Sequence, residues 1–300
     1  MRIDVHQHLW SPPFVEALRA RSGPPRLSGW TLELAGEPAY RVAPQDHEIG
    51  RRLELNRADG LDLALVSLSS PLGIELLPPD EAAPLLEAYH EGALALPDGF
   101  GVWAAGCVSR PDPKTLEALL ETGCVGLQLP ATALADRAGY EHCEPLLRVL
   151  EERGRPLFVH PGAASMTAAA PPPPWWAAAV DYVHQMHAAY FAFAAFGRPA
   201  HPALKICFAM LAGLAPTHRE RVRARGGPVG ATGTADAPAD QGTWFETSSY
   251  GDAALAAMTG ALGEAGGGLI VLGSDRPYAA PTRLPDEEAA ARAAAALLEP

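Results

Sequence analysis

The chain has 300 residues, of which 48% are hydrophobic, and a formal net charge of −12. This length accommodates one large domain such as an α/β barrel, which takes about 250 residues. The acidic balance disfavours nucleic acid and anionic membrane surfaces as partners. No apolar run in the sequence is long enough to span a bilayer.

The first residues show no basic region followed by an apolar stretch, because a strand pattern begins almost at Met1. We therefore expect no signal peptide and a cytoplasmic location. The four cysteines show no CxxC pairing, so we expect buried thiols in a reducing compartment. The expected partner is a small molecule, and the chain could act as a homodimer.

Segments with strand character alternate with helical patterns along the chain. The expected strands are residues 2–9, 61–69, 100–108, 125–129, 157–160, 204–209, 244–247 and 269–273. The expected helices are residues 46–58, 80–96, 112–123, 144–153, 175–196, 216–225, 252–265 and 286–298. This alternation predicts a parallel sheet, and the strand count favours a closed, distorted (β/α)8 TIM barrel over an open sheet. Residues 1–300 then form a single domain.

Residues 112–123 show both helix-end signals. Asp112 and Pro113 have the residue types preferred at the N-cap and the first helical position, and Gly123 is suited to end the helix.

Two long segments follow expected strands, at residues 11–45 and 163–174. In a barrel such segments lie on the catalytic face, so we expect them to cover the site and set specificity. Tryptophans in or near them could form a wall for an apolar or aromatic substrate: Trp10, Trp30, Trp175 and Trp176. The Gly/Ala/Pro-rich segment 226–242 should lie on the opposite face, and we expect it to be mobile and irrelevant to catalysis.

The first expected strand contains His6-Gln7-His8. Alternate residues of a strand share a face, so Asp4, His6 and His8 should point one way. Buried imidazoles need partners, and neutral imidazole is a common metal ligand. The motif therefore favours a metal site over the alternative, an exposed strand with two solvated histidines.

Two later strands end in further ligand types, His160 and Asp275. The carboxyl ends of barrel strands meet at one face, and closure makes the last strand a neighbour of the first. Asp275 can therefore approach His6 and His8. The alternatives are a core histidine before a Pro-Gly turn for His160 and an N-cap for Asp275.

Three imidazoles and one carboxylate predict one divalent ion, for which Zn²⁺ fits best and Mn²⁺, Co²⁺ and Fe²⁺ also fit. Such an ion lowers the pKa of a bound water toward neutrality. Asp275 could hold that water and carry its proton, which would produce a hydroxide directed at a carbonyl carbon.

Three short motifs together resemble the amidohydrolase superfamily: His6-Gln7-His8, Phe158-Val159-His160-Pro161 and Gly273-Ser274-Asp275-Arg276-Pro277. The similar branch contains the aminocarboxymuconate-semialdehyde and resorcylate decarboxylases and the pyrone-dicarboxylate lactonases. The resemblance implies a distorted barrel with a mononuclear metal at His6, His8, His160 and Asp275.

The chain departs from this group at two strand ends. Binuclear members carry a bridging carboxylated lysine or glutamate where this chain has Gln128, so one metal is favoured. The decarboxylases end strand six with a histidine, and Met210 occupies that place. By strand alternation Met210 should point into the barrel end, where a thioether cannot transfer a proton.

The resemblance also suggests substrate contacts. Arg52 matches by spacing an arginine that holds a substrate carboxylate, although it could equally be a surface residue of its helix. His218 could reach the site in place of the missing histidine, or lie on the surface. With Trp10 and Met210, these complete the expected substrate-binding set.

Three functions remain open. The first is a metal-dependent hydrolase of an ester, lactone or amide of a small organic acid. The second is a non-oxidative decarboxylase of an aromatic or muconate-type acid, against which Met210 counts. The third is a catalytically degenerate barrel that binds a small ligand.

Overall fold

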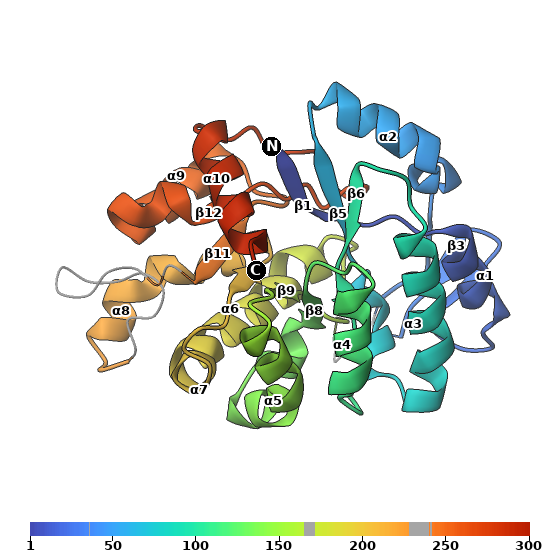
Figure 1. Cartoon of the computed structure of the whole chain (residues 1–300), viewed down its shortest axis with the longest axis horizontal. Coiled ribbons are helices and arrows are strands. Elements are labelled where there is room, and N and C mark those ends of the chain that lie inside the picture. The colour runs from blue at the N-terminus through green and yellow to red at the C-terminus, as the bar shows by residue number, and fades with distance from the viewer. Residues whose placement is uncertain (36, 165–171, 228–239, 241) are drawn as a thin grey trace.

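The computed structural model describes residues 1–300 except 36, 165–171, 228–239 and 241. Most of the predicted loop at 226–242, and most of the predicted covering segment at 163–174, therefore lie outside the described residues. Figure 1 shows the strands gathered in the middle of the molecule with the helices around them.

Parallel strands form the centre of the fold. They are β1 (Ile3–Gln7), β5 (Leu63–Val66), β6 (Phe100–Val102), β7 (Ala104–Ala105), β8 (Leu127–Pro130), β9 (Leu157–His160), β10 (Ile206–Phe208), β11 (Thr243–Glu246) and β12 (Ile270–Val271). Pairing runs β1-β5-β6 in one sheet and β7-β8-β9-β10-β11-β12 in the other. Only Trp103 separates β6 from β7, so these two are halves of one strand that joins the sheets.

Backbone hydrogen bonds join β1 to the segment that contains and follows β12. The nitrogen of Val5 donates to the oxygen of Leu272 at 2.8 Å, Asp275 donates to His6 at 2.9 Å, and His8 donates to Arg276 at 2.7 Å. The first and last strands are therefore neighbours, and the predicted barrel is confirmed.

Helices pack outside the strands, as expected for crossover connections between parallel strands. The barrel helices are α2 (Ile49–Ala58), α3 (Pro79–Leu94), α4 (Pro113–Glu121), α5 (Arg137–Glu152), α6 (Tyr182–Ala192), α7 (Arg198–Ala200), α8 (Arg219–Arg223), α9 (Asp252–Leu262) and α10 (Glu287–Leu298). The predicted cap of α4 is present: the Asp112 carboxylate accepts from the backbone nitrogens of Lys114 and Thr115.

Helix α5 begins earlier than the predicted residue 144. The carboxylate of Asp136 accepts from the backbone nitrogen of Gly139 and caps the helix there. Pro145 lies inside the helix, although proline is more typical of a first helical position. The predicted long helix at 175–196 is also modified, because π-helical turns at Ala177–Asp181 and Phe193–Gly197 flank α6.

Residues 11–45 contain regular structure that the sequence pattern did not predict. Helix α1 (Pro12–Ala20) is followed by a small antiparallel sheet of β2 (Arg26–Ser28), β3 (Thr31–Glu33) and β4 (Tyr40–Arg41). Strands of two or three residues are too short for alternation to be visible. An Arg26–Glu33 ion pair of 2.7 Å crosses the β2–β3 pair.

The chain turns in a left-handed sense directly after β10. The φ angles of Met210, Leu211, Ala212, Gly213 and Leu214 lie between 48° and 65°. This corrects the predicted placement of Met210, because strand alternation ends before it. Left-handed geometry costs about 1–2 kcal/mol per non-glycine residue, so the surroundings must hold this turn in place.

The barrel core is aromatic near the site. Trp103 stacks on Phe158 with ring centroids 5.2 Å apart, and Phe208 stacks on Phe245 at 6.3 Å. All four side chains are buried. Every residue of β1 is buried as well, which is typical of a parallel sheet covered on both faces.

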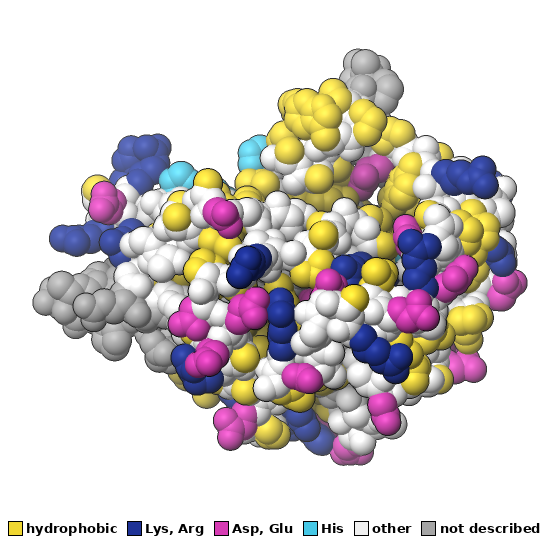
Figure 2. All heavy atoms as spheres, turned by 90° about the horizontal axis from the view of Figure 1, so that it is seen from above, with side chains coloured by type: hydrophobic (Ala, Val, Ile, Leu, Met, Phe, Trp, Pro, Cys, Tyr) yellow, Lys and Arg dark blue, Asp and Glu magenta, His cyan; other side chains and the backbone are white. Residues whose placement is uncertain are grey.

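Among the described helices, none is long and apolar enough to cross a membrane. On the face shown in Figure 2, acidic and basic side chains are interspersed.

Two glycines provide a test of the backbone geometry. Gly123 follows α4 with φ +116°, and Gly260 lies within α9; an added Cβ would meet nothing within 4 Å at either position. Gly123→Ala should lower the free energy of unfolding by about 1 kcal/mol because alanine is strained at positive φ. Gly260→Ala should raise it by about 0.5–1 kcal/mol through helix propensity. Urea unfolding of both variants tests the pair, and equal effects would contradict these helix boundaries.

Candidate metal centre

Four side chains meet at the carboxyl ends of the strands. His6 and His8 come from β1 and the residue after it, His160 ends β9, and Asp275 follows β12. One ligand atom from each lies within 4.8 Å of every other. The Nε2 atoms of His6 and His8 are 3.0 Å apart, and the Oδ1 atom of Asp275 lies 3.5 Å and 3.2 Å from them.

The other nitrogen of each imidazole faces an oxygen atom. Nδ1 of His6 lies 3.2 Å from the Glu246 carboxylate, Nδ1 of His8 lies 3.0 Å from the Ser67 carbonyl, and Nδ1 of His160 lies 2.7 Å from the Pro161 carbonyl. These oxygens only accept hydrogen bonds, so each Nδ1 carries a proton and each Nε2 lone pair is directed at the cluster.

Converging lone pairs repel one another unless a cation lies between them. Donor atoms around a tetrahedral zinc ion lie roughly 3.3 Å apart, since each Zn–N distance is about 2.0–2.1 Å. The separations among His6, His8 and Asp275, 3.0 to 3.5 Å, are compatible with that geometry, and His160 lies within 4.8 Å of them. The four residues therefore fit a divalent ion.

The pKa shifts of two of the three histidines agree with this fit. Burial lowers the pKa of His8, and burial together with the neighbouring His6 and His8 holds the pKa of His160 well below its ordinary value. Burial would also lower the pKa of His6, but the carboxylates of Glu246, Asp275 and Asp4 leave it raised. Near neutral pH, His8 and His160 are the neutral imidazoles that a metal requires.

Asp275 is the open member of the cluster. Its side chain is 21% exposed, whereas the three histidines are buried. Its φ angle is +56°, a left-handed conformation that aspartate tolerates better than most residues. This turn directs the carboxylate at the histidines while the backbone nitrogen of Asp275 remains bonded to His6.

Two buried carboxylates, Asp4 and Glu246, support the cluster, a role that was not predicted for either residue. Asp4 accepts from the Gln7 side chain at 2.8 Å and from the backbone nitrogens of His6 and Ser274 at 3.1 and 3.0 Å. It thereby fixes β1 against the segment that carries Asp275. Burial raises its pKa, although these hydrogen bonds oppose the shift.

Glu246 links three segments of the site. Its side chain is fully buried at the end of β11. It accepts from His6, from the backbone nitrogen of Met210 at 2.7 Å, and from the backbone nitrogen and hydroxyl of Ser248. Gly273 leaves room for it, because a Cβ at Gly273 would lie 1.9 Å from Glu246 Oε2. The only sequence signal was a charged residue at the end of an apolar strand.

No protein-family model matches the chain. A curated relative, the 6-methylsalicylic acid decarboxylase of Penicillium expansum, is 28% identical over 177 residues, which are 53% of this chain and 48% of that protein. The chain thus matches about half the length of this relative.

Solved structures match over nearly the whole chain. The 5-carboxyvanillate decarboxylase of Sphingomonas paucimobilis has a TM-score of 0.72 and 19% identity, and the match covers 99% of this chain and 98% of that one. The Novosphingobium aromaticivorans enzyme of the same name, complexed with manganese and 4-hydroxy-3-methoxy-5-nitrobenzoic acid, has a TM-score of 0.66 and 18% identity, with 93% and 87% covered. The 2,6-dihydroxybenzoate decarboxylase of Rhizobium has a TM-score of 0.59 and 17% identity, with 93% and 89% covered.

This chain has the fold of the amidohydrolase superfamily. The resemblance predicted from the three motifs is confirmed at the level of the fold, which is what likeness at such identities can show.

In this amidohydrolase-type barrel, Gln128 lies on β8 and is fully buried. Its side-chain nitrogen donates to the Leu68 carbonyl and to the Ser70 hydroxyl, both at 2.7 Å. Its amide is thus bonded to the segment after β5.

The predicted substrate residues are placed in different surroundings. Met210 is partly buried, and its backbone contacts Glu246, so it adjoins the cluster through that carboxylate. Trp10 is buried: its ring stacks on His47 at 4.5 Å, and its indole nitrogen donates to Ser69. His218 is exposed, and its ring lies 5.4 Å from that of His187. Their part in substrate binding stays a prediction.

Arg52 is not a surface residue of its helix, which was one of the two expectations. It is 1% exposed. Its Nη1 atom donates to the Gln7 side chain and to the His8 carbonyl, and Nη2 donates to the Asp46 carbonyl at 2.6 Å. The guanidinium thus supports the end of β1.

Glu246 provides a test of how the cluster is held. Glu246→Gln keeps the shape, but its amide hydrogens would face groups that themselves donate. We expect metal affinity to fall about 10- to 100-fold, the usual effect of changing a partner of a ligand histidine. Calorimetric titration of metal into stripped protein measures this.

The matched control is Glu151→Gln, because Glu151 lies 3.0 Å from Nδ1 of His201, outside the cluster. Its metal affinity should equal that of the wild type. An unchanged affinity for Glu246→Gln would mean that His6 does not depend on this carboxylate.

Proposed function

We propose that this protein is a metal-dependent decarboxylase of a small aromatic carboxylic acid and a member of the amidohydrolase superfamily. The observation that carries the proposal is the His6, His8, His160 and Asp275 cluster at the carboxyl ends of the strands. Two comparisons support it: whole-chain likeness to solved decarboxylases of aromatic acids, and 28% identity to a 6-methylsalicylic acid decarboxylase. They reverse the predicted order, in which hydrolysis came first.

In this proposal the four cluster residues hold one divalent ion, which when bound supplies Lewis acidity toward the substrate's oxygen atoms. Zinc was the ion predicted from the ligand types. A solved structure similar to this chain contains manganese, so both ions belong in the test. The imidazoles are fixed by their Nδ1 partners and need no reorganisation to bind.

Decarboxylation requires the protein to deliver one proton to the substrate. The bond between the ring carbon and the carboxylate carbon breaks, carbon dioxide leaves, and the electron pair stays on the ring carbon. That carbon must then accept a proton. Asp275 is suited to deliver it, because its side chain is the cluster member open to solvent and can be reprotonated between turnovers. Met210 supplies contact area and no proton.

Met210 favours a second candidate function, the hydrolysis of an ester, lactone or amide. Hydrolysis requires an activated water and one proton carrier near the leaving group, and Asp275 could serve. Met210 in place of a histidine is no obstacle to that reaction.

Parallel assays with aromatic acids and with lactones and esters distinguish the candidate functions. The metal-loaded protein would be incubated in D₂O with 6-methylsalicylate, 5-carboxyvanillate and 2,6-dihydroxybenzoate, and in parallel with simple lactones and esters. We expect carbon dioxide from at least one aromatic acid, with one deuterium on the ring for each molecule released. Lactone or ester cleavage without carbon dioxide would favour the hydrolase. Saturable binding without turnover would favour a degenerate barrel.

Met210 provides a second test of this proposal. Met210→His introduces an acid at the residue whose backbone nitrogen bonds to Glu246, at a left-handed position that histidine tolerates. If proton delivery limits decarboxylation, kcat should rise at least about tenfold, within the range of general acid catalysis.

The control for this test is Met210→Leu, which changes the contact surface without adding a proton carrier and should leave kcat within about twofold of the wild type. An equal response of the two variants would show that side-chain shape, and not proton transfer, matters at this position.

A further inference from the structure

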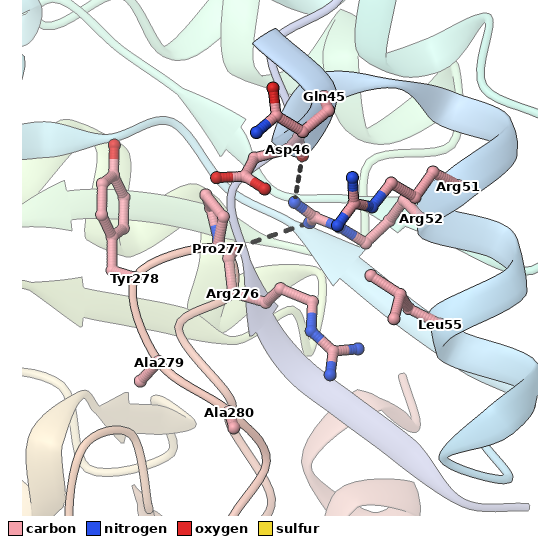
Figure 3. Close-up of a pocket in the computed structure, with 10 residues that line it drawn as sticks. All are labelled: Gln45, Asp46, Arg51, Arg52, Leu55, Arg276, Pro277, Tyr278, Ala279 and Ala280. Atoms are coloured by element: carbon pink, nitrogen blue, oxygen red, sulfur yellow. Dashed lines mark hydrogen bonds between the residues drawn. The ribbon is translucent and has the colours of Figure 1, made fainter. Parts of the chain in front are cut away.

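A cavity lies beside the metal centre and is lined by none of the four cluster residues. Its volume is about 380 Å³, and it opens between α2 with the preceding turn and the loop after β12. Figure 3 shows Arg51, Arg52 and Leu55 on one side of it and Arg276 with its loop on the other. This volume lies in the range of small-molecule sites, about 300–1,000 Å³.

Three guanidinium groups line this cavity, against one carboxylate, that of Asp46. Arg276 is paired with Asp59 at 2.7 Å. Arg51 is exposed and makes no ion pair or hydrogen bond with the described part of the chain through its side chain.

The buried guanidinium of Arg52 is the strongest reason to expect an anion in this cavity. This guanidinium bonds only to neutral oxygens, those of Gln7, His8, Asp46 and Arg276, and no described carboxylate lies within 4 Å of it. A buried charge without a counter-charge in contact is costly, and the carboxylates of Asp4 and Asp46 offset only part of that cost from a greater distance. Burial, and then the nearby charge of Arg276, lower the pKa of Arg52 to about 10.

The remaining lining is largely apolar: Leu55, Pro277, Ala279 and Ala280. A ligand with one carboxylate and a compact apolar body would match both parts. Arginine binds a planar carboxylate through two parallel hydrogen bonds. Inorganic phosphate would satisfy the charge but leave the apolar wall without contact.

We propose that this cavity binds a small organic carboxylate, at a site separate from the metal centre. The carboxylate lies between Arg51 and Arg276 with Arg52 behind it, and the apolar body lies against Leu55 and the loop after β12. The two sites share a wall: Arg52 contacts the His8 carbonyl, and Tyr278, which lines the cavity, has its ring 5.7 Å from that of His8.

Calorimetric titration of the metal-loaded protein with benzoate tests this inference. Arg51→Gln should weaken binding at this site at least about tenfold, as expected for the loss of a charge-assisted contact. Leu55→Glu should abolish it, since a carboxylate would then occupy the mouth of the cavity at a position that is already 38% exposed. Arg57→Gln, on the same helix but outside the lining, should bind as the wild type does.

Benzoate could also bind at the metal centre, so His160→Ala is titrated in parallel. Binding retained in His160→Ala and weakened in Arg51→Gln supports the separate site. Binding lost in His160→Ala and unchanged in Arg51→Gln overturns it, as does phosphate binding more tightly than benzoate. Failure to release carbon dioxide would defeat the proposed activity and leave this result unaffected.

Discussion

The contact between β1 and the segment after β12 is the constraint on which the rest of the structure depends. Three backbone hydrogen bonds set the register between the beginning and the end of the barrel. One of them joins Asp275 to His6, so the bond that closes the ring also brings the carboxylate to the imidazoles. Asp4 strengthens the same contact by accepting a hydrogen bond from the backbone nitrogen of Ser274. The contact that closes the barrel therefore also places Asp275 beside His6 and His8.

The groups around this contact are polar and buried, and several of them hydrogen-bond to one another. Arg52 bonds to Gln7, Gln7 donates to Asp4 and to Asn56, and Asp4 accepts from the backbone of His6. Breaking one hydrogen bond in such a buried network costs free energy, because it leaves a polar group without a partner. The network therefore tends to hold the groups that it joins in fixed positions. The histidines are thus held before any ligand arrives, as a precise binding site requires.

The parts of this site that the sequence predicted are those with a local signature. A His-X-His pattern within an apolar strand, and histidine or aspartate just past two further strands, predicted that His6, His8, His160 and Asp275 would meet. Parallel topology completed this prediction, because it brings the carboxyl ends of the strands together regardless of their separation in the chain. Glu246 had no such signature, since its role depends on the backbone of Met210 and on the space left by Gly273.

Backbone conformation was the harder part to predict. The small sheet in residues 11–45 has strands too short to show a period. Arg52 was predicted to bind substrate or to lie on the helix surface, and neither prediction included its burial against β1. The left-handed turn after β10 was not predicted from the sequence for another reason. Gly213 is the one residue of the turn whose type favours positive φ, and leucine and alanine at Leu211, Ala212 and Leu214 give no sign of it.

That turn has a consequence for chemical synthesis. Its hand is the one that D-amino acids adopt without strain, by mirror symmetry with the right-handed preference of L-residues. Glycine at position 212 would remove the strain and also a buried methyl group, so the two effects could not be separated. D-Alanine, introduced by semisynthesis, would relieve the strain and keep a methyl group, which would exchange places with the α-hydrogen. Semisynthetic protein could therefore measure the cost of chirality beside the metal centre in a chain of otherwise natural composition.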